Sequence, residues 1–148
     1  MSQIKRIGLD TSKAVFTLHC VDESGKAVLR TNLRRAQMAT FFKNLAPAEI
    51  ALEACASAHH WARELTVLGH EVRLIPPQYV KPFVKRAKND RNDAEAICEA
   101  ASRPSMTFVP VKSATQQAEL MILRTRKLPA SQRTQLVNAL RGHAASSV

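Results

Sequence analysis

The sequence has few acidic residues for its length. Twelve Asp and Glu stand against 22 Lys and Arg in 148 residues, which leaves a formal net charge of +10 at pH 7. An excess of this size is typical of proteins with a polyanionic partner, most often nucleic acid. Aromatic residues are also few, and Trp61 and Tyr79 do not suffice for a platform on which bases would stack. The composition therefore favours a nucleic-acid partner that is bound through its phosphates.

Cysteines and long apolar runs are scarce as well. Cys20, Cys55 and Cys98 are far apart and no C-x-x-C occurs, so neither a zinc ribbon nor a disulfide framework is expected. This cysteine usage fits a reducing cytoplasm. No run of 18 apolar residues occurs, and the first residues lack the apolar core of a signal peptide. The sequence therefore predicts a cytoplasmic protein with no membrane-spanning helix.

The order of the predicted elements indicates an α/β domain. Strands are expected over residues 4–10, 14–21, 27–33, 49–55 and 71–75, and the first three form a meander because Gly25 suits a turn. Helices follow the third, fourth and fifth strands, and Ser57 and Gly69 are expected to begin and end the second helix. This order is also that of the ribonuclease H fold. We therefore expect a mixed sheet flanked by helices over residues 1–110.

Residues 111–148 have a different character and predict a helical extension outside the sheet domain. Ser113 and Gln116 form a candidate capping box at its start. Residues 124–141 carry several basic side chains and no acid. Pro129 predicts that the extension breaks there or starts late, because a proline inside a helix costs about 3 kcal/mol.

Two acidic residues lie where their neighbours predict burial. Asp10 ends the apolar run "IGLD", and Glu53 lies within "IALEAC". A buried carboxylate must be paired, protonated or bound to a cation. Taken singly, each has an ordinary interpretation, a capped turn for Asp10 and a structural ion pair for Glu53.

Asp90 and Asp93 are three residues apart and would share one face of a helix, where acids in the first turn commonly offset the helix dipole. If that helix crosses the first and fourth strands, all four carboxylates can converge. Such an oxygen-rich shell suits Mg²⁺ or Mn²⁺. Two ions about 3.5–4 Å apart would act on the attacking and leaving oxygens of a phosphodiester. The basic residues expected to bind the nucleic acid are Lys13, Lys81, Lys85, Arg86, Lys88, Arg91, Arg124, Arg126 and Arg133.

Four sequence blocks carry a resemblance to a known family. They are "GLDTSK" at 8–13, "ALEAC" at 51–55, "KNDRNDAEAI" at 88–97 and "QRTQLVNALRGH" at 132–143. In this order they resemble the N-terminal RuvC-like domain of DEDD transposases of the insertion sequence 110 family. The resemblance implies a ribonuclease H-like fold, a catalytic and metal-binding tetrad of Asp10, Glu53, Asp90 and Asp93, and recombination of the element's DNA ends with target DNA.

The same resemblance implies further partners. The family uses a structured bridge RNA as guide, and its members continue into a C-terminal domain with a nucleophilic serine. This sequence ends at Val148. We therefore expect the catalytic domain with the start of a linker or coiled coil, inactive in strand exchange by itself, and a homo-oligomer is left open.

Three alternatives use some of the same residues. A stand-alone RuvC-like nuclease or Holliday-junction resolvase would need the same acids and metal, but the block at 132–143 favours the transposase. A non-catalytic nucleic-acid-binding module would not require four converging acids. A sugar-kinase-like ATPase would need glycines after Asp10, where close backbone approach is required, and the sequence has Thr11, Ser12 and Lys13 there.

Overall fold

The computed structural model describes residues 3–11, 14–84 and 90–145, with the side chains of residues 90 and 91 outside this description. The chain divides into two compact units, Met1–Val111 and Lys112–Val148. The first unit holds the sheet and its covering helices, and the second unit is a long helix.

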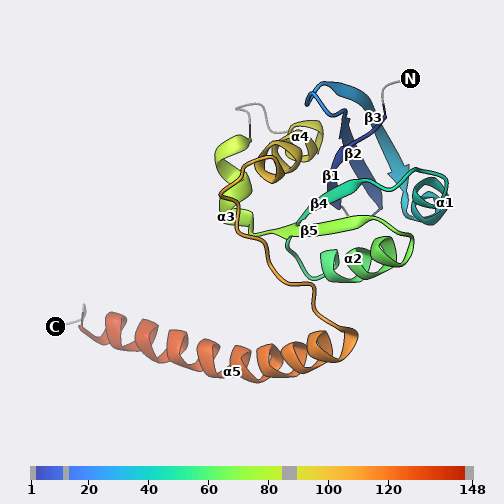
Figure 1. The fold of residues 1–148 in the computed structure, drawn as a ribbon. Coiled ribbons are helices and arrows are strands. Elements are labelled where there is room, and N and C mark those ends of the chain that lie inside the picture. The colour runs from blue at the N-terminus through green and yellow to red at the C-terminus, as the bar shows by residue number, and fades with distance from the viewer. Residues whose placement is uncertain (1–2, 12–13, 85–89, 146–148) are drawn as a thin grey trace. The chain divides into compact units, whose positions relative to one another are not determined.

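The first unit is built on a five-stranded mixed sheet (Figure 1). Strands β1 (Arg6–Thr11), β2 (Val15–Val21) and β3 (Ala27–Arg34) form an antiparallel meander. Strand β4 (Glu49–Glu53) pairs in parallel with β1, and β5 (Glu71–Ile75) pairs in parallel with β4, so the order is β3-β2-β1-β4-β5. The predicted mixed sheet is confirmed, and the arrangement is compatible with a ribonuclease H-like fold.

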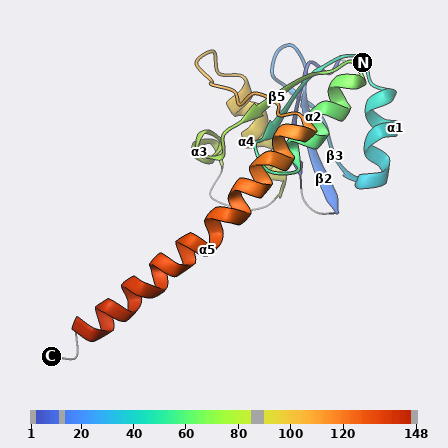
Figure 2. The same cartoon turned by 90° about the horizontal axis from the view of Figure 1, so that it is seen from below.

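Helices cover both faces of the sheet (Figures 1 and 2). Helix α1 (Met38–Lys43), which follows the 3₁₀ turn η1 (Arg35–Gln37), and helix α2 (Ala58–Val67) pack Phe42 and Leu65 against Leu9 and Leu52 on one face. On the other face lie α3 (Pro77–Val80), the 3₁₀ turn η2 (Lys81–Phe83) and α4 (Asp90–Ala101). The sheet is therefore the middle layer of three, and each face has its own apolar core.

Helix α4 lies unusually close to β1. A Cβ atom on Gly8 would fall 2.1 Å from the carbonyl oxygen of Ala94 and 2.7 Å from Cβ of Cys98. Only glycine fits at this position, because any side chain would overlap the helix backbone. The absent side chain at Gly8 therefore sets the height of α4 above the sheet.

Two predicted helix boundaries are confirmed by their hydrogen bonds or backbone angles. Gly69 follows α2 with a φ of 92°. At the start of α5 (Ala114–Ala145), the amide of Gln116 donates to Oγ of Ser113 at 3.1 Å, and the amide of Ser113 donates to Oε1 of Gln116 at 2.9 Å. This reciprocal pair is a capping box.

The predicted break at Pro129 is wrong, because α5 continues through this residue as one helix of 32 residues (Figure 2). Proline lacks an amide hydrogen and removes the bond to the carbonyl of Thr125, four residues earlier. The loss is confined to one turn, and regular turns continue on both sides. No helix in the described part of the chain is long and apolar enough to span a membrane.

Candidate metal centre and nucleic-acid interface

The parallel pairing of β1 and β4 brings Asp10 and Glu53 to neighbouring positions. Gly8 pairs with Ala51 and Leu9 pairs with Leu52, so Asp10 and Glu53 are the next residues along the two strands. Leu9 and Leu52 face the core beneath α1 and α2. Because side chains alternate along a strand, Asp10 and Glu53 point to the opposite face, which α4 covers. Both residues are half-buried there.

Helix α4 runs in a direction that brings Asp93 toward Asp10 and Glu53. Ala94 and Cys98 lie over Gly8. Burial raises the pKa of the Cys98 thiol to about 11, and the nearby positive charge of Arg6 acts in the opposite direction, so Cys98 lies near the start of β1. The helix therefore runs antiparallel to β1. Its first turn, which contains Asp90 and Asp93, lies toward the carboxyl ends of β1 and β4.

The electrostatics at Glu53 confirm that three elements meet there. Burial is the first cause of the raised pKa of the Glu53 carboxyl, and the negative charge of Asp93 is the second. The positive charge of Lys81, from η2, acts in the opposite direction. Asp93 and Lys81 are thus close enough to Glu53 for their charges to change its pKa.

The predicted tetrad stays a prediction as a complete set. The backbone of Asp90 begins α4, but its side chain lies outside the described residues. Among the side chains that are described, no group of three or more His, Cys, Asp or Glu is arranged to hold a metal ion. What the structure gives is the adjacency of Asp10 and Glu53 and the electrostatic interaction of Glu53 with Asp93.

A cluster of hydroxyl and thiol groups follows the two strand-end acids. Oγ1 of Thr11 lies 3.7 Å from Sγ of Cys55, which lies 3.3 Å from Oγ of Ser57. Ser57 occupies the position before α2, as predicted, but its side chain makes no capping hydrogen bond. It is instead directed to Cys55. The position of Thr11 and Cys55 just after the acids was the signal that could have identified this cluster.

Comparison with known proteins identifies the family. A family model of DEDD transposases of insertion sequence IS110, described as "Transposase", matches residues 7–146. The chain belongs to this IS110 transposase family. It is 58% identical over 139 residues to a probable family 20 transposase of Pseudomonas aeruginosa, with 94% of this chain and 41% of the relative aligned.

Two other relatives of this IS110-family chain show the same pattern. A putative transposase of Sinorhizobium fredii is 56% identical over 144 residues, which cover 97% of this chain and 37% of the relative. The transposase for insertion sequence element IS1111A of Coxiella burnetii is 44% identical over 142 residues, which cover 96% and 39%. The chain thus spans about two fifths of the length of these relatives. The family membership favours the transposase interpretation over a resolvase or a kinase-like ATPase.

The basic residues predicted to bind nucleic acid in this IS110-family chain divide into three groups. Lys81 is described and lies near Glu53. Arg124, Arg126 and Arg133 are exposed on α5. The others, whose side chains lie outside the described residues, are Lys13, Lys85, Arg86, Lys88 and Arg91. Their role in binding stays a prediction.

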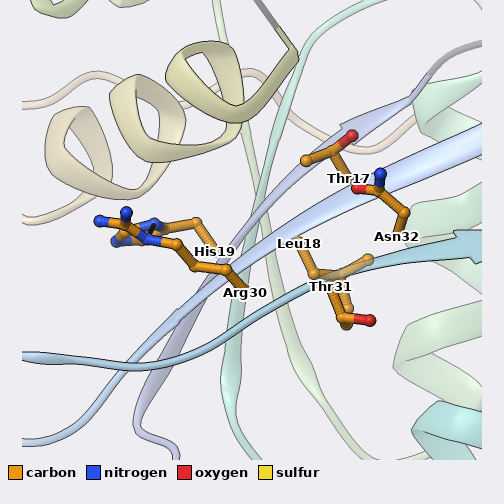
Figure 3. A pocket seen from close by; sticks show the side chains of 6 residues that line it. All are labelled: Thr17, Leu18, His19, Arg30, Thr31 and Asn32. Carbon is orange, nitrogen blue, oxygen red and sulfur yellow. Dashed lines mark hydrogen bonds between the residues drawn. The ribbon is translucent and has the colours of Figure 1, made fainter.

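A cavity lined by residues of the paired strands β2 and β3 was not predicted from the sequence (Figure 3). Its volume is about 330 Å³, and it is lined by Thr17, Leu18, His19, Arg30, Thr31 and Asn32. Nε of Arg30 donates to Nδ1 of His19 at 3.2 Å, and the same guanidinium lies 3.7 Å from the carboxylate of Glu95 on α4. These residues come from two strands, so only the register of the sheet reveals that they line one cavity.

Proposed function

We propose that this chain is the metal-dependent catalytic region of a DNA transposase. In this proposal Asp10, Glu53, Asp90 and Asp93 hold Mg²⁺ or Mn²⁺ at the carboxyl ends of β1 and β4. The observation that carries it is the pairing of β1 with β4, which places Asp10 beside Glu53. The raised pKa of Glu53, caused by burial and by the nearby charge of Asp93, supports it. Carboxylates that repel one another in a partly buried place are stabilised by a cation.

The donor set fits a hard divalent ion. Asp10 and Glu53 offer carboxylate oxygens from adjacent strands, and Asp93 offers another from the first turn of α4. Oxygen donors of this kind suit Mg²⁺ and Mn²⁺. The flanking Cys55 is exposed, but a thiolate is a soft ligand that these ions do not favour.

Different parts of the chain would have separate roles in the reaction at a phosphodiester. A bound divalent ion would supply the positive charge that polarises the phosphate and activates the attacking oxygen. Lys81 would bind a neighbouring phosphate, since its ammonium group lies near Glu53 and is exposed. Helix α4 would exclude water from one side of the reacting phosphate, because it packs directly on β1 and β2.

The partners follow from the charge and from the family. We infer that the substrates are the DNA ends of the element and target DNA, that a structured RNA guides the reaction, that the protein acts in the cytoplasm, and that several copies act together. The net charge of +10 supports the nucleic-acid partners. Arg124, Arg126 and Arg133 on α5 would contact further phosphates.

Thermal unfolding with and without divalent ions tests the proposal. At one hundred times the dissociation constant, an ion that binds only the native state adds about 2.7 kcal/mol to the free energy of unfolding. Mg²⁺ or Mn²⁺ should therefore raise the melting temperature of the unaltered chain, and the Asp10→Asn and Glu53→Gln variants should respond less.

The matched control is Glu64→Gln, which removes an exposed carboxylate on α2, on the opposite face of the sheet. Its response to Mg²⁺ should equal that of the unaltered chain. An equal response of all four proteins would show that the ion binds elsewhere and would contradict the proposed metal centre.

A further inference from the structure

The register of the meander extends the row of polar side chains that begins at Asp10. Asp10 pairs with Thr17, and Thr17 pairs with Asn32, so one residue of each strand lies in this row. The row before it consists of Gly8, His19 and Arg30. Both rows face the α4 side of the sheet, because Leu9 and Leu18, between them, lie in the opposite core. Asp10, Thr17 and Asn32 are therefore neighbours on one surface.

The side chains of Thr17 and Asn32 line the cavity beside β2 and β3 from this surface. Figure 3 shows them close together on one side of the strands, with Thr31 on the other side. Thr17 is only 5% exposed, and Asn32 is exposed. The hydroxyl of Thr17 and the carboxamide of Asn32 both border the cavity. A hydroxyl and a carboxamide each carry both donors and acceptors, so this pair offers a ligand both kinds of hydrogen-bonding group.

The charges around the cavity indicate an anionic ligand that extends beyond it. Arg30 borders the cavity with a side chain that is 55% exposed, although it also pairs with Glu95. Arg, Thr and Asn are among the side chains that contact phosphate and sugar oxygens in DNA complexes. Neighbouring strands are about 4.8 Å apart, so Asn32, two strands away, lies about 10 Å from Asp10 in backbone position.

We propose that the surface of Thr17, Arg30 and Asn32 binds the sugar–phosphate backbone of a single DNA strand, next to the phosphate held at Asp10. This inference rests on the proposed function, since it uses Asp10 as the end of the path. The side-chain amide of Asn32 donates to a phosphate oxygen, and the hydroxyl of Thr17 donates to a phosphate or sugar oxygen. The guanidinium of Arg30 supplies the neutralising charge. The strand therefore crosses the meander before it reaches the carboxylates.

The test compares two identical substitutions on opposite faces of the sheet. Asn32→Asp places a negative charge in the proposed path, and Asn44→Asp places the same charge at the exposed end of α1. Fluorescence anisotropy measures the affinity of the full chain for a short single-stranded DNA in Mg²⁺. We expect Asn32→Asp to bind about tenfold more weakly, because a charged hydrogen bond is lost. Asn44→Asp should retain the original affinity. Equal affinities of the two variants would overturn the proposal.

A photo-crosslinking side chain at each position provides a second measurement that does not depend on affinity. Position 32 should crosslink to the DNA and position 44 should not, and equal crosslinking would overturn the proposal. Arg30→Gln should also reduce the salt dependence of binding by about 0.7 in the slope of log K against log salt, the contribution of one phosphate in a single strand. An unchanged slope would contradict the role of Arg30.

The outcomes separate this inference from the proposed function. If Glu53→Gln weakens the response to Mg²⁺ but the two Asp variants bind DNA equally, the metal centre stands and the strand path is wrong. If Mg²⁺ acts equally on the unaltered chain and Glu53→Gln, the proposed function itself fails. RNA of the same sequence is the third arm. Loss of RNA binding alone in Asn32→Asp would assign the cavity to RNA and overturn the DNA assignment.

Discussion

At the residue scale, Glu53 links the structure of the site to its dependence on pH. Its pKa is raised, first by burial and then by the charge of Asp93. The native state therefore binds this proton more tightly than the unfolded chain does. The stabilising contribution is present at acid pH and is lost as the pH rises from the ordinary value of 4.5 through the raised value.

The raised pKa of Glu53 predicts how the Glu53→Gln variant behaves in the absence of divalent ions. Glutamine has no charge to desolvate, so the variant should be more stable than the unaltered chain at about pH 7, and the difference should shrink toward about pH 4. Urea unfolding at several pH values measures it. Glu64→Gln, at an exposed position, should show no such trend, and a Glu53→Gln variant that is less stable at neutral pH would contradict the argument.

A second residue, Gly8, determines how closely α4 approaches the site. Gly8→Ala would place Cβ 2.1 Å from the Ala94 carbonyl oxygen. Overpacking of this kind costs about 1–3 kcal/mol, so the variant should melt at a lower temperature and bind Mg²⁺ more weakly. Gly142→Ala is the matched control, because nothing lies within 4 Å of its added Cβ. Within α5 it should stabilise the helix by about 1 kcal/mol. Equal effects of the two variants would show that α4 does not depend on Gly8.

At the element scale, α5 tests how a long helix accommodates proline. Replacing Pro129 with alanine restores an amide donor to the carbonyl of Thr125 and should stabilise the helix by about 3 kcal/mol. The expected result is a higher helix content that persists to higher temperature, measured by far-ultraviolet circular dichroism. Ser131→Ala, two residues further along the same exposed helix, should gain much less. Similar gains would indicate that Pro129 does not weaken α5.

Elements with local signals could be predicted from the sequence, and those that depend on distant residues could not. Gly25 and the Ser113–Gln116 capping box each act within a few residues, and both are confirmed. The adjacency of Asp10 and Glu53 was predicted because strand-end acids in a mixed sheet have few possible arrangements. The position of Thr17 and Asn32 in one row with Asp10 was not predicted, because it depends on the register of three strands.

At the scale of the whole molecule, the excess of positive charge predicts strong salt dependence of DNA binding. Each phosphate that is neutralised contributes about 0.9 to the slope of log K against log salt for duplex DNA. Changing Arg124, Arg126 and Arg133 together to glutamine should reduce that slope by up to about 2.7, which is about 0.9 for each charge removed. The same three positions changed to lysine should keep it, because lysine retains the charge. A slope that is unchanged in the glutamine variant would exclude α5 from the interface.

The close contact at Gly8 also has a consequence for the gene. A change of either of the first two bases of a glycine codon never leaves glycine in place. At codon 8 such a mutation ends translation or puts a side chain where the Ala94 carbonyl lies, and the second outcome moves Asp93 away from Glu53. Under the proposed function, we expect a gene copy with this missense change to keep its open reading frame while its product binds the metal poorly, so that the copy is inherited but does not move.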